Sequence, residues 1–91
     1  METTHGLAET IHTYTARFQD DDGAVYAILA RGELRDDGMW EGWLEFQPLD
    51  GGQPLRTGRE TTQPGRDALV YWASGLEPVY FEGAFERAAG L

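Results

Sequence analysis

Two copies of the tripeptide Asp-Asp-Gly, at residues 21–23 and 36–38, separate three segments in which apolar and polar residues alternate. A period of two predicts half-buried strands at 12–18, 24–35 and 39–47, although the apolar spacing of 24–34 also fits a helix. Aspartate and glycine are typical of tight turns, because aspartate bonds to nearby backbone and glycine tolerates a positive φ angle. The spacing therefore predicts an antiparallel meander of three strands.

The length of each turn decides which side chains share a face of this meander. A two-residue loop would place Leu34 opposite Glu41 and mix apolar with charged residues on one face. A three-residue loop with glycine in the left-handed region places Leu34 opposite Trp40 instead. Applied to both hairpins, it predicts six apolar pairs on one face: Leu34–Trp40, Ala30–Leu44, Ile28–Phe46, Phe18–Tyr26, Ala16–Ile28 and Tyr14–Ala30. We also expect positive φ angles at Gly23 and Gly38.

The second half of the chain predicts a short edge strand at 54–57, then a loop or irregular strand at 58–62. A helix should follow, with Thr62 as its N-cap, Pro64 in its first turn and Gly75 as a left-handed C-cap. Its apolar stripe consists of Leu69, Trp72, Ala73 and Leu76. Alternation of Val79, Phe81, Gly83 and Phe85 predicts a last strand at 79–87.

A chain of 91 residues, 41% of them apolar and none of them cysteine, has room for one small core and no disulfide framework. We predict a single domain over 1–91, with frayed ends at 1–10 and 88–91. The predicted fold class is α+β: a curled antiparallel sheet of four to five strands with one helix packed on one face. The element order is β-β-β-(β)-α-β, and the alternative is a partly open, SH3-like barrel.

The charge balance restricts the classes of partner. Sixteen acids against seven bases, all of them arginine, give a net charge of −9, which repels nucleic-acid phosphates and anionic membranes. No apolar run approaches the roughly 20 residues of a membrane helix. The segment METTHGLAET has neither the basic nor the apolar region of a secretory signal. We therefore expect a cytoplasmic protein that binds neither nucleic acid directly nor membranes.

The residues that usually carry catalysis are scarce. There is no cysteine or lysine, Ser74 lies outside any G-x-S-x-G motif, and His5 and His12 are the sole imidazoles. The acids Glu33, Glu41 and Glu45 are interpreted as a solvated sheet face. The acidic run at 20–23 lacks the alternating spacing of a calcium loop and is better explained as a turn. We predict no enzyme activity, no metal site and no cofactor.

Residues 53–66 contain three of the seven arginines and a single acid, Glu60. This stretch leads into the expected helix, whose N-terminal N–H groups and dipole favour anions. The candidate anion-binding residues are Arg56, Arg59, Thr61, Thr62 and Arg66. The alternative is that these arginines pair with carboxylates of the protein itself.

Trp43 alternates away from the apolar face that Trp40 shares, and the predicted register sets it opposite Arg31. The aliphatic residues of that outer face complete an apolar patch edged by charge, the usual makeup of a protein contact surface. The candidate interaction residues are Val25, Leu29, Arg31, Trp43 and Leu49. The alternative is a sheet curled so that the chain covers this face itself.

The strings WEGWLEF, TGRETTQP and YWASGLEPVYFEGAF resemble a group of short uncharacterised bacterial proteins, over most of residues 12–87. The resemblance implies a bacterial and cytoplasmic origin. It implies no activity, substrate or site residue.

Together these features favour a small acidic domain that acts as a non-catalytic protein-interaction module, with a homodimer as one form of that contact. An anion or small-ligand binder at the arginine-rich segment is the alternative. An acidic mimic of nucleic acid, occupying a basic partner, is the third hypothesis.

Overall fold

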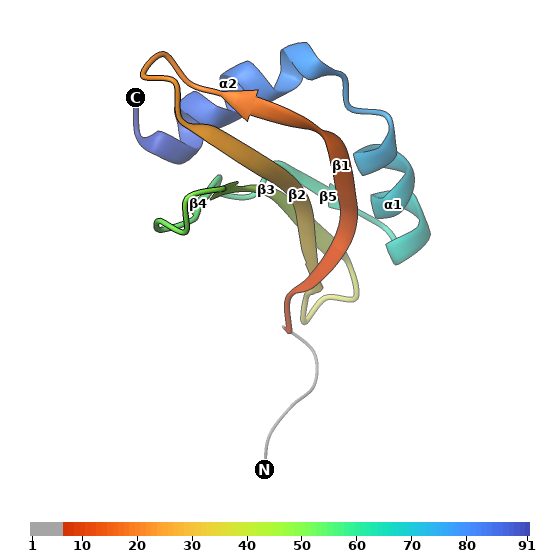
Figure 1. Cartoon of the computed structure of the whole chain (residues 1–91). Helices are drawn as coiled ribbons and strands as arrows, with labels where there is room; N and C mark the ends of the chain where they lie inside the picture. Colours follow the sequence, from red (N-terminus) through yellow and green to blue (C-terminus); the bar gives the residue numbers. More distant parts are fainter. Residues whose placement is uncertain (1–6) are drawn as a thin grey trace.

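A computed structural model describes residues 7–91 as one curved antiparallel sheet with two helices (Figure 1). The elements are β1 (Glu9–Gln19), β2 (Val25–Leu34), β3 (Trp40–Pro48), β4 (Leu55–Arg56), β5 (Thr61–Gln63), α1 (Arg66–Ser74) and α2 (Pro78–Ala89). The sheet order is β1-β2-β3-β4, and β5 also pairs with β3. The predicted α+β class with a sheet of four to five strands is confirmed, and the sheet does not close into a barrel.

The register between β2 and β3 is the one that the second turn predicts. Leu34 lies opposite Trp40, Ile28 lies opposite Phe46, and the glycine pair Gly32–Gly42 falls between them. The turn is closed by the Gly38 N–H, which donates to the Arg35 carbonyl at 3.0 Å. Gly23 and Gly38 have φ angles of 88° and 85°, as a three-residue loop requires.

The register between β1 and β2 follows the prediction only next to the turn. Phe18 lies opposite Tyr26, but a bulge between Thr13 and Arg17 shifts the pairing, and His12 rather than Tyr14 lies opposite Ala30. The predicted pairs Ala16–Ile28 and Tyr14–Ala30 are therefore wrong. Extra residues in one strand bend it and redirect its side chains.

Tyr14 shows what the bulge achieves. Its side chain is buried, and its hydroxyl donates a 2.6 Å hydrogen bond to the carbonyl of Ala73 in α1. The same ring packs edge-on against Phe81 of α2, with 4.9 Å between ring centres. Tyr14 thus ties the edge strand to both helices.

The last element is a helix, so the strand predicted at 79–87 is wrong. Pro78 occupies the first turn of α2, where its missing N–H costs nothing. Phe81, Ala84 and Phe85 are buried at helical spacing, while Val79, assigned to the same face by the strand pattern, is 71% exposed. Residues 79–87 fit both the two-residue period of a strand and the 3.6-residue period of a helix, and packing against the sheet selects the helix.

The helix ends also differ from expectation. Thr62 lies in β5, where it pairs with Glu41 of β3, and the N-cap of α1 is Gly65 instead. Gly75 has a φ of −94°, so it is not a left-handed cap; Gly90, after α2, has a φ of 78° and takes that role. Regular structure reaches into both ends expected to fray, since β1 begins at Glu9 and α2 runs to Ala89, whereas residues 1–6 lie outside the described part of the chain.

The core lies between the inner face of the sheet and both helices. Its buried members from β2 and β3 are Tyr26, Ile28, Ala30, Leu44 and Phe46, and those from the helices are Leu69, Ala73, Phe81, Ala84 and Phe85. One face of the sheet is therefore covered by two short helices rather than by one. This arrangement leaves α2 beside the β1–β2 turn (Figure 1).

Candidate functional site

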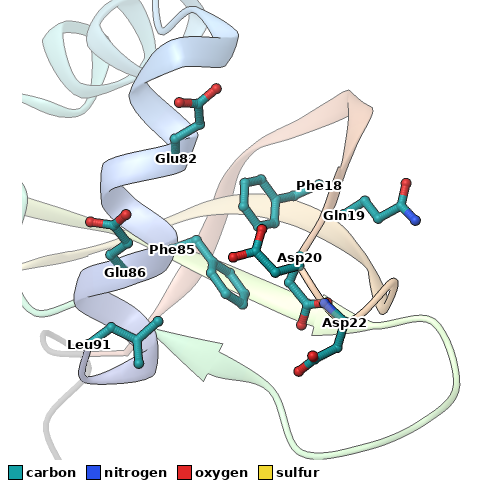
Figure 2. Close-up of a pocket in the computed structure, with 9 residues that line it drawn as sticks. Phe18, Gln19, Asp20, Asp22, Glu82, Phe85, Glu86 and Leu91 are labelled. Carbon is teal, nitrogen blue, oxygen red and sulfur yellow. The ribbon is translucent and has the colours of Figure 1, made fainter.

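A hollow of about 600 Å³ opens between the β1–β2 turn and the C-terminal half of α2. We call it the acidic hollow; its lining residues are Phe18, Gln19, Asp20, Asp21, Asp22, Glu82, Phe85, Glu86 and Leu91. Figure 2 shows Glu82 and Glu86 on one side, the turn residues on the other, and the Phe85 ring between them. Five of the nine lining residues are carboxylates.

Asp20 is held in place by the turn itself. Its Oδ1 accepts hydrogen bonds from the backbone N–H groups of Asp22 and Ala24, each at 2.9 Å, and its Oδ2 accepts one from the Tyr26 hydroxyl at 3.2 Å. Such local bonds are the reason that aspartate begins turns. The two carboxylates that follow are exposed and lie on the lining of the hollow.

Burial raises the pKa of Tyr26, and the hydrogen bond to Asp20 raises it further. The negative charges of Asp20, Asp50 and Asp22 act in the same direction. The phenol of Tyr26 therefore lies in a region of negative potential at the edge of the acidic hollow.

The two glutamates of the hollow are placed unfavourably for their own helix. Glu82 and Glu86 are four residues apart, a spacing at which like charges repel along a helix. Glu86 also lies in the last turn of α2, where the helix dipole disfavours negative charge. Within residues 7–91, none of the five carboxylates makes an ion pair. A cation in the hollow would relieve this repulsion.

Phe18 and Phe85 form the aromatic part of the lining. Their rings are stacked with 4.5 Å between centres, and Phe46 lies edge-on to both of them. Aromatic rings beside carboxylates suit a cation on an alkyl stem, because the rings contact the stem and attract the charge. The hollow can therefore bind a group with both properties.

Comparison with family models, curated proteins and solved structures found no match to this chain.

Sequence reasoning missed this site because its two sides are about sixty residues apart in the chain. The acidic run at 20–23 predicts only a turn, which it forms, and the alternation at 79–87 predicts a strand where Glu82 and Glu86 lie on a helix. The signal that could have found it is the i, i+3, i+4 spacing of Phe81, Ala84 and Phe85, followed by Gly90. Together they indicate a helix with both glutamates on neighbouring turns.

The five residues predicted to bind anions do not form one cluster of free donors. Arg66 donates to Glu9 Oε1 from Nη2 at 2.8 Å and from Nε at 3.1 Å. Arg56 lies on the outer face of the sheet, while Arg59 is exposed in the loop before β5. Thr61 and Thr62 are strand residues that pair with β3.

Glu60, the acid between these arginines, belongs to a partly buried polar cluster with α2. It accepts hydrogen bonds from the Tyr80 hydroxyl at 2.5 Å and from Arg87 Nη2 at 2.7 Å. Burial raises the pKa of Glu60, but the bonds from Arg87 and Tyr80 outweigh it and leave that pKa below its ordinary value. Burial and the Glu60 carboxylate raise the pKa of Tyr80 to about 12. This cluster fastens the loop to the helix.

Val25, Leu29, Arg31 and Trp43 lie on one face of the sheet by strand alternation, and Leu49 follows the end of β3, but Trp43 is not exposed. Arg31 lies opposite Trp43, and the Leu49 N–H bonds to the Val25 carbonyl at 3.0 Å. Trp43 is only 2% exposed, and the guanidinium carbon of Arg56 lies 4.1 Å from its ring centre. The expectation of an exposed tryptophan is therefore wrong, because β4 brings an arginine over the ring. Leu49 remains 57% exposed.

In the described part of the chain, no three histidine or acidic side chains are grouped so that they could hold a metal ion. Neither helix between residues 7 and 91 is long and apolar enough to span a membrane.

Proposed function

We propose that this protein is a non-catalytic interaction module of the bacterial cytoplasm, and that its acidic hollow binds an arginine or lysine side chain on a basic segment of a partner protein. The observation that carries the proposal is that five acidic residues line one hollow beside the Phe18 and Phe85 rings and make no ion pair within residues 7–91. The bacterial and cytoplasmic setting follows the expectation from sequence. No catalytic step is part of the proposal.

Charge and shape both support a basic partner. The net charge of −9 attracts a cationic segment at long range, which speeds association. The open hollow then offers carboxylates to the cationic head and aromatic rings to its stem. The third hypothesis, an acidic mimic of nucleic acid, is a special case in which the basic partner is itself a nucleic-acid-binding protein.

Self-association through the outer sheet face has less support. Trp43 contributes little apolar area to a second copy, because it is 2% exposed. Leu49 is the largest exposed apolar side chain among the five residues of that surface. A contact of ordinary size needs far more area than one such residue supplies.

The test is calorimetric titration with an arginine–glycine repeat peptide. Glu82→Gln combined with Glu86→Gln should weaken binding about tenfold or more, because two partners of the cation are lost. Glu33→Gln combined with Asp67→Asn is the matched control, since it removes the same number of charges away from the hollow and should weaken binding about twofold or less.

Equal weakening by both double variants would contradict the proposal, because binding would then follow net charge alone. Unchanged binding by the Glu82/Glu86 variant would contradict it as well. The two glutamines should not destabilise α2, since they remove a repulsive pair. A melting curve of each variant checks that the fold is retained.

A further inference from the structure

The outer face of the sheet holds two buried polar atoms that have no hydrogen-bond partner in the described part of the chain. Trp43 Nε1 and Arg31 Nε are both buried, and neither has a hydrogen-bond partner within residues 7–91. The two residues lie directly opposite each other on β3 and β2. Buried donors are nearly always paired, so two unpaired donors on adjacent strands indicate that an acceptor is supplied from outside the chain.

The guanidinium groups of Arg31 and Arg56 lie beside these atoms, and within the described chain both bond to neutral oxygens only. Arg31 donates from Nη1 to the Thr10 hydroxyl at 2.7 Å, and Arg56 donates from Nε to the Thr57 carbonyl at 3.2 Å. Neither arginine has an ion pair among the described residues, although acids outnumber bases sixteen to seven in the chain. Two guanidinium groups therefore flank one buried indole, and within residues 7–91 no carboxylate is bonded to either.

The nearest acid on this face has other contacts. Glu45 lies opposite Arg56 across the β3–β4 pair, yet its Oε1 accepts a hydrogen bond from the Gln47 amide at 3.0 Å. Glu33 follows Arg31 on the same face and lies opposite Glu41. These carboxylates repel anions, so a bound anion must be held by direct contact with the two guanidinium groups.

We propose that Arg31, Trp43 and Arg56 form a binding site for a small oxyanion, a carboxylate or a phosphate group. Arg56 is the movable part, since it is exposed and lies over the Trp43 ring. When the Arg56 side chain moves off the Trp43 ring, an oxyanion accepts hydrogen bonds from Trp43 Nε1 and Arg31 Nε. The guanidinium groups of Arg31 and Arg56 both attract its negative charge. The site is independent of the acidic hollow, which lies at the turn and α2.

The three tryptophans of this chain give a direct test by nuclear magnetic resonance. Each indole N–H gives its own signal, and Trp43→Phe identifies the signal of Trp43 by its loss. Titration with inorganic phosphate, and separately with acetate, should move the Trp43 signal downfield to saturation while the Trp40 and Trp72 signals stay in place. Sodium chloride at the same ionic strength should not reproduce the shift. The salt that saturates at lower concentration identifies the oxyanion class.

Arg31→Gln and Arg56→Gln should each raise the concentration needed for half of the shift about tenfold, because each removes one positive charge from the anion. Arg59→Gln is the matched control, because Arg59 is exposed and lies in the loop before β5, and it should leave that concentration unchanged. An immobile Trp43 signal in both phosphate and acetate would overturn the proposal. So would equal weakening by Arg59→Gln, which would indicate a general effect of net charge. If Arg31→Gln is unfolded, Arg56→Gln decides the question alone.

Discussion

Leu69 lies so close to Gly42 that a β-carbon on the glycine would stand 2.6 Å from Leu69 Cδ1. Gly32, directly across the β2–β3 ladder, is equally restricted, because its β-carbon would stand 2.5 Å from Leu69 Cδ2. Leu69 is completely buried. The two glycines, which have no β-carbon, therefore leave the room that Leu69 of α1 needs to pack against the sheet.

Gly42→Ala should lower the free energy of unfolding by about 1–3 kcal/mol, because a buried leucine has little room to move. Leu69→Ala should cost about 2–5 kcal/mol through the cavity it leaves. In the double variant the new methyl group enters that cavity, so the combined cost should be smaller than the sum. Urea unfolding of all four proteins measures the coupling. If the losses of unfolding free energy in the two single variants simply add in the double variant, Gly42 and Leu69 are not in tight contact.

Stability should depend on pH through Glu60. Its pKa is below the ordinary value in the folded protein, so its contribution is present above the unfolded pKa and is lost as the pH falls through the lowered, folded pKa. Glu60→Gln should lower stability at pH 7 by about 2 kcal/mol, because charge-assisted bonds from Arg87 and Tyr80 are weakened. Its unfolding free energy should also fall less than that of the parent between about pH 5 and pH 3. Parallel pH profiles for both proteins would contradict this role.

Tyr14→Phe should lower the free energy of unfolding by about 1–2 kcal/mol, because the hydroxyl donates to Ala73 in a buried place. The ring and its contact with Phe81 are retained, so the fold should not change. Thermal unfolding gives the difference. Burial also raises the pKa of Tyr14, so its phenol should resist ionisation in alkaline solution longer than a free tyrosine does. Early titration of Tyr14 would mean that the bulge opens.

Trp43→Glu and Leu49→Glu should differ sharply, although both residues belong to the outer surface expected from sequence. Trp43 is 2% exposed and Leu49 is 57% exposed. Burying a carboxylate in place of the indole should cost about 3 kcal/mol or more, whereas the exposed position should change by about 0.5 kcal/mol or less. Circular dichroism during denaturation compares them. A fully stable Trp43→Glu protein would support the exposed face predicted from sequence.

Much of the sheet could be predicted because its determinants are local. The Asp-Asp-Gly turns hold their own geometry through aspartate hydrogen bonds and positive-φ glycines, and each sets the register of the residues next to it. The pairs Leu34–Trp40 and Phe18–Tyr26 follow from that geometry alone. The same local signals placed Arg31 opposite Trp43.

What lies farther from a turn depended on tertiary contacts. The β1 bulge places Tyr14 against Ala73, a residue 59 positions later, and no pattern within β1 specifies that partner. Whether Phe81 and Phe85 belong to a strand or a helix was decided by which period packs against the sheet. The acidic hollow exists only because that packing lays Glu82 and Glu86 beside the first turn.

The sequence by itself determined the turns, the register of the central hairpin and the excess of negative charge, because each depends on neighbouring residues or on simple composition. The tertiary structure alone decided that α2 is a helix, that Arg56 covers Trp43 and that five acidic residues line one hollow. These features depend on burial between segments distant in the chain. Burial depends on the whole folded structure, because an apolar residue is stabilised by the surfaces that lie next to it in space, whatever their distance in the sequence.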